Sequence, residues 1–359
     1  MTTARPVVFA IVGNGWRAEF FLRVAQALPE RFRVAGVVTR RAEAGEAITK
    51  RYSVPAFRSL DDVVRAGSPE FAVVSVARHA APGLIRDVAE LGLPVLTETP
   101  PAAELPELYA LNRLTQYGAR IQVAEQYHLQ PLLAAQLRIA GSGRLGEVSL
   151  AQVSACHDYH GISLIRRLLG VGYEDAVITA KEYEFPVAAG PSRHGEAEAE
   201  ATVAERQTIA QLDFGGRLGV YDWTSEQYYS LVRSRSVLVR GSRGEIRDTE
   251  VRYLQDYRTQ MRHSIRRLNA GENGNLQGYY LKGLVAGDEW LYHNSFVPAR
   301  LNDDELAIAD LLEKMSHYAA GGPDVYSLAE ASQDHYLQLM VRKAAGTGAA
   351  VRTEPQPWA

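Results

Sequence analysis

The residues with the clearest chemistry lie near the start of the chain, where a glycine turn follows an apolar run. Residues 7–12 are all apolar, as expected for a strand buried on both faces. The spacing that follows, Gly-x-Gly-x-x-Ala, is a variant of the dinucleotide fingerprint. Gly13 would allow the tight turn, Gly15 the close approach of a pyrophosphate, and Ala18 close packing of helix against strand. We therefore interpret this turn as a phosphate cradle, with a purely structural turn as the alternative; the predicted cofactor-binding residues are Gly13, Asn14, Gly15, Trp16 and Arg17.

A second set of candidate residues ends the next predicted strand, at 34–39. An NAD-preferring site usually carries an acidic residue here, which accepts hydrogen bonds from the ribose hydroxyls. This chain instead has Thr39, Arg40 and Arg41. Guanidinium groups bind a 2′-phosphate in bidentate fashion. The sequence therefore predicts NADP(H) as cofactor, with NAD(H) possible, and with arginines that simply face solvent as the alternative.

Alternating strands and helices must position these residues. Strands are predicted at 7–12, 34–39, 72–77, 95–98 and 121–125, and helices at 18–28, 42–52, 60–66, 82–91 and 103–117. This alternation is typical of a doubly wound parallel sheet, whose ligands bind beyond the carboxyl ends of the strands. Ala77, Glu98 and Gln126 lie at such ends, so we expect them beside the glycine turn as further cofactor-binding residues.

The character of the sequence changes after about residue 146. Strands are predicted at 147–156, 176–183, 206–214, 218–224, 236–240 and 245–248, with a hairpin turn at 241–244. Helices are predicted at 303–318 and 328–345, and a mobile loop at 186–200. We therefore predict an α/β chain with two domains. Residues 1–125 form a dinucleotide-binding Rossmann-type domain with a doubly wound parallel sheet, and residues 126–359 form a substrate and oligomerisation α+β domain with a large, mostly antiparallel sheet.

The composition limits the classes of binding partner and the cellular compartment that we expect. The 359 residues include 39 basic and 42 acidic side chains, a net charge of −3, which predicts neither a nucleic-acid nor a membrane partner. Clustered arginines between 233 and 247, among them Arg235, are interleaved with acids and read as a solvated sheet face. The single cysteine, Cys156, excludes an intrachain disulfide and fits a reducing compartment. Without zinc-type spacing, a membrane-spanning run or a leader, we expect no metal and a cytoplasmic location.

Several segments, taken in order, resemble the glucose-fructose oxidoreductase, inositol dehydrogenase and rhizopine-catabolism family, known as Gfo/Idh/MocA. They are Gly-Asn-Gly-Trp-Arg at 13–17, Thr-Glu-Thr-Pro at 97–100, Glu-Gln-Tyr-His-Leu-Gln-Pro at 125–131, Gly-Ser-Gly-Arg-Leu-Gly-Glu-Val at 141–148 and the segment at 160–170 that begins His-Gly-Ile. The resemblance implies a Rossmann domain followed by a sheet domain that often mediates dimer or tetramer formation. It also implies an NAD(P)-dependent redox reaction on a sugar, polyol or related small molecule.

The chain departs from the family pattern at the catalytic positions. In the family, the lysine of a Glu-Lys-Pro segment sits by the nicotinamide, and an Asp-x-x-x-His pair completes proton transfer. Here Thr99 and Cys156 stand at the lysine and aspartate positions, and only His160 is retained. Thr99 could bond a substrate oxygen or relay a proton, while Cys156 fits a small buried hydrophobe or, in an electropositive setting, a thiolate. The resemblance implies that Glu98 contacts the nicotinamide ribose.

His160 is interpreted as the general acid or base, with a helix-start histidine bonded by backbone as the alternative. Asp158 is predicted to N-cap the same helix, or else to orient a histidine. Tyr127 and His128 are predicted to end a strand at the crevice, where they contact substrate or pack between domains. Aromatic residues at 221–229 suit a substrate pocket or an oligomer interface equally well. The catalytic residues we predict are His160, Thr99 and Tyr127.

The leading interpretation is an NAD(P)-dependent oxidoreductase that prefers NADP(H) and forms a homodimer or homotetramer. Its substrate would be a small sugar-like, carbonyl or imine compound, handled by a non-standard active site. Two alternatives stay open: a catalytically inactive nucleotide-binding regulatory protein, and a redox-neutral enzyme with a tightly held cofactor. Turnover of NADPH or NADP with any member of a substrate panel separates the first of these alternatives from the leading interpretation.

Overall fold

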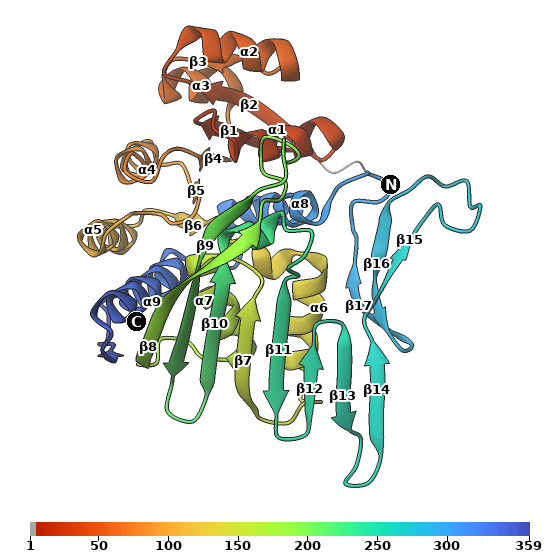
Figure 1. Cartoon of the computed structure of the whole chain (residues 1–359). Coiled ribbons are helices and arrows are strands. Elements are labelled where there is room, and N and C mark those ends of the chain that lie inside the picture. The colour runs from red at the N-terminus through yellow and green to blue at the C-terminus, as the bar shows by residue number, and fades with distance from the viewer. Residues whose placement is uncertain (1–4) are drawn as a thin grey trace.

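The computed structural model describes residues 5–359, which form three β-sheets (Figure 1). The first sheet has the strand order β3-β2-β1-β4-β5-β6, and all of its neighbouring pairs are parallel. Because the order reverses between β1 and β4, ligands are expected beyond the carboxyl ends of these two strands. The predicted doubly wound parallel sheet is confirmed. Its strands are β1 (Val7–Val12), β2 (Phe32–Val38), β3 (Ala56–Phe57), β4 (Phe71–Val74), β5 (Val95–Thr97) and β6 (Ile121–Val123).

The helices between these strands are the predicted ones, with ends that differ by one or two residues. Their inward faces are apolar; in α1, for example, Phe21, Leu22 and Val24 are buried in the core. The short strand β3 was not predicted, because two residues are too few to show a hydrophobic period. The helices are α1 (Ala18–Ala27), α2 (Ala42–Tyr52), α3 (Leu60–Gly67), α4 (Ala81–Glu90) and α5 (Leu105–Gln116).

The second sheet has nine strands in the order β14-β13-β12-β11-β7-β10-β9-β8-β18, and only β7 and β10 pair in parallel. The predicted large, mostly antiparallel sheet is therefore confirmed, as is the hairpin turn that places Gly241 opposite Gly244. The strands are β7 (Val148–Ser154), β8 (Val177–Ala188), β9 (Thr202–Asp213), β10 (Leu218–Thr224), β11 (Ser236–Gly241), β12 (Gly244–Arg247), β13 (Glu250–Leu254), β14 (Gln260–Ser264) and β18 (Val351–Arg352).

Other parts of this half were missed or misplaced by the sequence prediction. Strands β8 and β9 are longer than expected, so residues 186–188 belong to β8 and the connecting loop is 189–201. In Figure 1 the tip of this loop lies beside α1. A third sheet, with the order β15-β16-β17, was not predicted, because its short strands mix charged and apolar residues. These strands are β15 (Arg266–Asn269), β16 (Leu281–Ala286) and β17 (Glu289–His293).

Helices connect the two large sheets. Helix α7 (Asp158–Leu169) packs against β7 and β10, and α9 (Leu328–Thr347) packs against β8 and also contacts α5 and β6 of the first sheet (Figure 1). The backbone N–H of Val123 donates to the carbonyl of Tyr326 at 2.9 Å, just before α9. The division at residue 125 stays a prediction, and residues 1–4 of the first predicted domain lie outside the described part of the chain. The other helices are α6 (Pro131–Ala140), which was not predicted, α8 (Asp303–Ala319), and the 3₁₀ turns η1 (Tyr127–Leu129) and η2 (Ser225–Tyr228).

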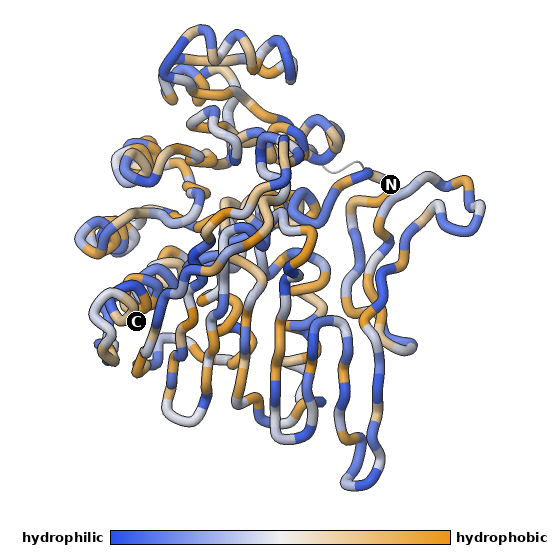
Figure 2. Tube along the Cα trace, viewed as in Figure 1, coloured by the Kyte–Doolittle hydropathy of each residue, from blue (hydrophilic) through white to orange (hydrophobic). Residues whose placement is uncertain are grey.

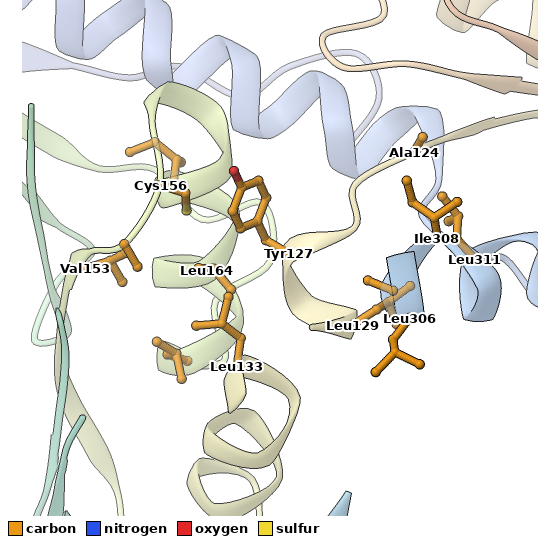
Figure 3. Close-up of a cluster of buried hydrophobic side chains, with 14 of the residues drawn as sticks. Ala124, Tyr127, Leu129, Leu133, Val153, Cys156, Leu164, Leu306, Ile308 and Leu311 are labelled. Carbon is orange, nitrogen blue, oxygen red and sulfur yellow. The ribbon is translucent and has the colours of Figure 1, made fainter. Parts of the chain in front are cut away.

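The apolar core continues from the first sheet into the second half of the chain. Figure 2 shows hydrophobic residues along the strands and at intervals along the helices. In Figure 3, Leu129 of η1 lies beside Leu306 and Ile308 of α8, while Tyr127 lies toward Cys156, which precedes α7. The segment after β6 is therefore fixed on both sides, which holds its polar side chains in place. Within residues 5–359, no helix is both long and apolar enough to cross a bilayer.

Candidate active site

A cavity of about 1160 Å³ lies at the carboxyl ends of β1, β2, β4 and β5 and extends to the start of α7. It is lined by every residue that we predicted to be catalytic or cofactor-binding, except Arg41. Arg41 is instead the residue that precedes α2, with an exposed side chain, and its carbonyl accepts a hydrogen bond from the Thr39 hydroxyl at 3.0 Å. The structure thus brings Thr39 and Arg40 to the cavity and leaves Arg41 outside it.

The glycine turn has the geometry expected of a phosphate cradle. Gly13 has φ +114°, and a Cβ at this position would lie 2.1 Å from the carbonyl oxygen of Ser75, which follows β4. A Cβ on Gly15 would meet no atom within 4 Å, so this residue borders open space in the cavity. Ala18 is fully buried at the start of α1. The turn therefore exposes backbone to the cavity at a helix N-terminus, which suits an anionic group.

Arg17 links the turn to the other half of the chain. Its Nη1 donates to Asp304 Oδ2 at 2.8 Å, and its Nε donates to Glu98 Oε1 at 3.4 Å. Asp304, in the first turn of α8, also accepts from Gln126 Nε2 at 3.3 Å. Burial by itself would lower the pKa of Arg17, but Glu98 and Asp304 together raise it, so the side chain stays charged. Within the described residues, Arg17 Nη2 and Gln126 Oε1 are buried without a partner, which leaves a donor and an acceptor available to a ligand.

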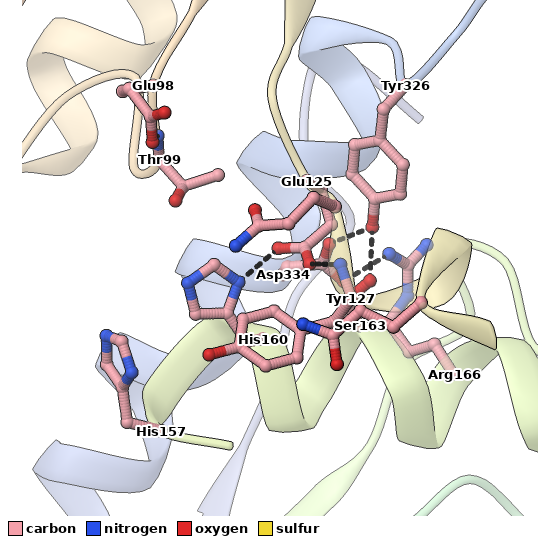
Figure 4. A network of polar contacts seen from close by, with 12 residues as sticks. Glu98, Thr99, Glu125, Tyr127, His157, His160, Ser163, Arg166, Tyr326 and Asp334 are labelled. Carbon is pink, nitrogen blue, oxygen red and sulfur yellow. Dashed lines mark hydrogen bonds and ion pairs between the residues drawn. The ribbon is translucent and has the colours of Figure 1, made fainter. Parts of the chain in front are cut away.

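His160 pairs with Glu125 at the floor of the cavity (Figure 4). His160 lies in the first turn of α7 and is 4% exposed, and its Nδ1 contacts the Glu125 carboxyl group just after β6. The His160 ring is therefore bonded by a side chain and not by the backbone. This excludes the alternative of a helix-start histidine whose ring is bonded by backbone groups. Burial raises the pKa of Glu125 to about 7 and lowers the pKa of His160 to about 3. Burial thus disfavours charge on both groups, and one proton can be shared between them near neutral pH.

The sequence analysis missed Glu125 as a site residue. The available signal was a carboxylate directly after a buried strand, on the crevice side of the sheet. Its partner lies 35 residues further along the chain, and no local pattern connects the two.

A hydrogen-bonded chain of ring side chains forms the neighbouring wall. Tyr127 Oη donates to Tyr228 Oη at 2.8 Å, and Tyr228 Oη lies 2.5 Å from His157 Nδ1. Burial lowers the pKa of His157 to about 4 and raises the pKa of both phenols above the usual range, so the chain is neutral at physiological pH. Tyr127 lies in η1 and does not end a strand as predicted; the 3₁₀ turn directs its ring across the cavity floor toward His160, at a centroid distance of 4.6 Å.

The structure decides between the alternatives for three residues near this wall. Cys156 is fully buried and burial raises the pKa of its thiol well above the usual value, so the buried-hydrophobe interpretation is confirmed and the thiolate is wrong. Asp158 does not N-cap α7: His157 is the N-cap residue, and the Asp158 carboxylate accepts from Gln338 and Arg342 of α9. His128 is partly buried and does not line the cavity; its ring packs against Tyr326 at a centroid distance of 5.5 Å, in line with the packing alternative and not with substrate contact.

Three arginines line the cavity that the sequence analysis did not place there. Arg58 follows β3, which pairs with β2, so it lies next to the end of β2. Arg193, from the loop between β8 and β9, has its guanidinium carbon 4.3 Å from the ring centroid of Trp16. Arg235 is solvent-exposed, as the sequence indicated, but it precedes β11 and lines the cavity, with its guanidinium carbon 5.2 Å from the ring centroid of Tyr228. No local signal could have located these residues, because each is brought to the cavity by strand pairing or a long loop.

Chemically, the cavity joins an anion-binding turn, a neutral proton-sharing pair and a hydrogen-bonding wall. Among residues 5–359, no group of three or more His, Cys, Asp and Glu side chains is arranged to hold a metal ion. Thr99 lines the cavity between the two ends, and its backbone N–H donates to Glu98 Oε2 at 3.4 Å.

Comparisons with known proteins agree with this arrangement. Residues 7–125 match the Gfo/Idh/MocA family, described as an oxidoreductase family with an NAD-binding Rossmann fold. A myo-inositol dehydrogenase, Hyg17 of Streptomyces leeuwenhoekii, is 30% identical over 150 residues, which are 42% of this chain and 45% of that protein. The matched region thus spans less than half of that relative.

Solved structures match over almost the whole chain. Levoglucosan dehydrogenase in complex with NADH superposes with a TM-score of 0.71 at 14% identity, covering 98% of this chain and 100% of the other. An oxidoreductase from Agrobacterium radiobacter, in complex with NAD+, L-tartaric acid and magnesium, gives a TM-score of 0.68 at 16% identity, covering 96% and 98%. At these identities the likeness establishes the fold.

Proposed function

Since residues 7–125 match the Gfo/Idh/MocA oxidoreductase family with its NAD-binding Rossmann fold, we propose that the protein is an NAD(P)-dependent oxidoreductase of a small sugar-like, carbonyl or imine substrate. The observation that carries the proposal is that the glycine cradle and His160, which is paired with Glu125 behind it, line one cavity. A bound nicotinamide would supply hydride transfer. The remaining requirement is a group that takes or gives the proton of the substrate oxygen or nitrogen.

The side chains around the cradle would hold the cofactor. Gly13 and Gly15 would admit the pyrophosphate to the N-terminus of α1, because a side chain at either position would meet the end of β4 or fill the space left open. The unpartnered Nη2 of Arg17 and Oε1 of Gln126 offer one donor and one acceptor to the cofactor. Asn14, Trp16, Thr39, Ala77 and Glu98 complete the predicted contacts along the same wall.

We further propose that the preferred cofactor is NADP(H), with Arg40 and Arg58 on the 2′-phosphate. Replacing Arg40 by Ala should weaken NADPH binding by about tenfold to a hundredfold, the cost of losing a charged hydrogen-bonding partner, and leave NADH binding within about twofold. The matched control is Arg41→Ala, since Arg41 does not line the cavity. Dissociation constants from fluorescence titration measure all of these effects. An NAD(H) affinity equal to that for NADP(H) in the unaltered protein would contradict the preference.

For proton transfer, the Glu125–His160 pair supplies a neutral imidazole. Which of its two ring nitrogens carries the hydrogen depends on whether Glu125 is protonated. Glu125 engages Nδ1, and Nε2 has no hydrogen-bond partner among the described residues. When Glu125 is ionised it accepts from Nδ1–H, so Nε2 carries a lone pair and can take a proton from an alcohol. When Glu125 is protonated, it donates to Nδ1, so the hydrogen of the imidazole is on Nε2. His160 can then donate this proton when the reaction runs in the reverse direction. Thr99 and Tyr127 would hydrogen-bond the substrate on either side.

This coupling predicts how activity depends on pH. Because Nε2 is a base only while Glu125 is ionised, the rate of substrate oxidation should rise with pH through a midpoint near 7, the value to which burial raises the pKa of Glu125. The charges nearest the pair, Arg167 and Arg17, favour the carboxylate and oppose this shift, while His157 is neutral in this range. Glu125→Gln cannot ionise, so it should lower the rate roughly tenfold or more and abolish the midpoint. A midpoint unchanged in Glu125→Gln would show that another group controls the profile.

The experiment that tests the proposed function is a turnover screen. Purified protein with NADP or NADPH is incubated with a panel of polyols, sugars, carbonyl compounds and imines, and the change in absorbance of the nicotinamide is followed. We expect turnover with at least one member. Tight NADPH binding without any turnover would favour a regulatory nucleotide-binding protein, and retention of cofactor through purification would favour redox-neutral chemistry.

We also propose that two copies or more associate through the large sheet. Along β8 and β9, the register places exposed apolar side chains on the face opposite the buried Ala210 and Leu212. Contiguous exposed apolar side chains are typical of an interface, and light scattering in solution measures the assembly. These side chains are Tyr183, Phe185, Val203 and Ile209.

A further inference from the structure

The cavity contains more positive charge than its own acidic side chains neutralise. Three carboxylates line it, and each is engaged: Glu98 and Asp304 by Arg17, and Asp303 by Arg267. Four lining arginines, by contrast, form no ion pair with any residue in the range 5–359. Unpaired cations in a cleft attract anions, so this excess indicates that the ligands of the cavity are anionic. The four are Arg40, Arg58, Arg193 and Arg235.

Three of these arginines lie at the cofactor end. Arg40 and Arg58 follow the paired strands β2 and β3. Arg193 lies over Trp16, the residue directly after Gly15 of the cradle. Their charge is accounted for by the phosphates of the proposed cofactor.

Arg235 lies at the other end of the cavity. Its guanidinium is over the ring of Tyr228, whose hydroxyl bonds both Tyr127 and His157. The neighbouring arginine of the same segment differs: Arg233 Nη1 lies 3.0 Å from Glu226 Oε1 and is neutralised. Of the two, only the arginine on the cavity wall lacks an acidic partner. A cation held there, beside the proton-transfer groups and away from the cradle, has no phosphate of the cofactor to bind.

We propose that Arg235 binds a carboxylate of the substrate, so that the substrate is a sugar acid or a related polyhydroxy acid and not a neutral sugar. This inference rests on the proposed function and names its substrate class. A guanidinium matches a carboxylate in bidentate geometry, and one unpaired arginine balances one negative charge. The hydroxyl groups of such an acid would meet the neutral donors and acceptors of Thr99, Tyr127 and Tyr228. A phosphate dianion would leave one charge unbalanced at this end.

The test compares binding of matched acid and neutral ligands to the NADPH-loaded protein by calorimetry. The probes are the methyl glycosides of glucuronic and galacturonic acid, the methyl glycosides of glucose and galactose, and methyl glucoside 6-phosphate; none has a free aldehyde to be reduced. In the unaltered protein, at least one uronide should bind about tenfold or more tightly than its neutral counterpart. Arg235→Ala should abolish this preference and Arg235→Lys retain part of it. Arg233→Ala, the matched control, should keep it.

Three results would overturn the inference: no uronide preferred over its neutral glycoside, a preference that survives Arg235→Ala, or the phosphate bound more tightly than either uronide. NADPH binding is titrated first in every variant. Failure to bind NADPH in the unaltered protein would count against the proposed function itself. Tight NADPH binding together with equal affinity for acid and neutral ligands would remove only the substrate class.

Discussion

Replacing His160 by Ala should lower kcat by roughly 10²- to 10⁴-fold, the usual contribution of a positioned general acid or base. The reason is geometric: His160 lines the cavity, Glu125 occupies its Nδ1, and Nε2 has no other hydrogen-bond partner among the described residues. Steady-state kinetics with a substrate from the turnover screen measure the effect. The affinity for NADPH should stay within about twofold, because we assign the His160 imidazole to proton transfer and the glycine cradle to cofactor binding.

The control for this variant is His317→Ala, which removes an exposed histidine from the last turn of α8. Its kcat should match that of the unaltered protein. A loss below about threefold in His160→Ala would remove His160 from the chemistry. In that case the Tyr127–Tyr228–His157 chain would be the next group to examine.

The second large effect concerns stability. Asp334→Ala should destabilise the fold by about 3–5 kcal/mol, because it removes the buried ionic partner of the Arg166 guanidinium and leaves only the partly exposed Glu330. Arg166 is 2% exposed, and its Nη1 donates to Asp334 Oδ1 at 2.6 Å. Asp334 also accepts from the hydroxyl of Tyr326, which in turn bonds Ser163 (Figure 4). This network joins α7 to α9 beneath the Glu125–His160 pair.

The measurement is equilibrium unfolding in urea at pH 8. Burial raises the pKa of Asp334 to about 6, so its carboxylate is ionised at pH 8 and the comparison refers to the ion pair. The matched control is Asp310→Ala on α8, which removes a solvent-exposed pair with Lys314 and should cost less than about 1 kcal/mol. Equal losses in the two variants would show that the buried network contributes no more than a surface contact.

Local sequence was sufficient wherever one continuous segment determines the conformation. The strand, glycine turn and helix at the start of the chain need only residues 7–27, because apolar runs, a positive φ at Gly13 and a small residue at Ala18 act on their immediate neighbours. The alternation of strands and helices up to residue 125 followed for the same reason. Short or strongly charged strands such as β3 and β15 lacked that pattern and were missed.

The NADP prediction shows where local sequence stops being sufficient and the tertiary structure is needed. Two consecutive arginines after β2 indicated a 2′-phosphate site, but only Arg40 lines the cavity. Arg58 takes the expected place of Arg41, because the pairing of Val38 with Phe57 puts the residues after β2 and β3 side by side. Strand pairing, and not adjacency in the sequence, therefore decided which guanidiniums line the cavity.

The sequence by itself determined the fold class, and it predicted the cofactor cradle and a catalytic role for His160. Only the tertiary structure decided what surrounds them: Glu125 against His160, Asp304 on Arg17, and Arg235 over Tyr228 on the cavity wall. The physical reason is that turns and helices form from interactions within a few residues, whereas a buried acid–histidine pair exists only after β6 and α7 have packed. That packing supplies partners from 35 and 287 residues away, beyond the reach of any local pattern.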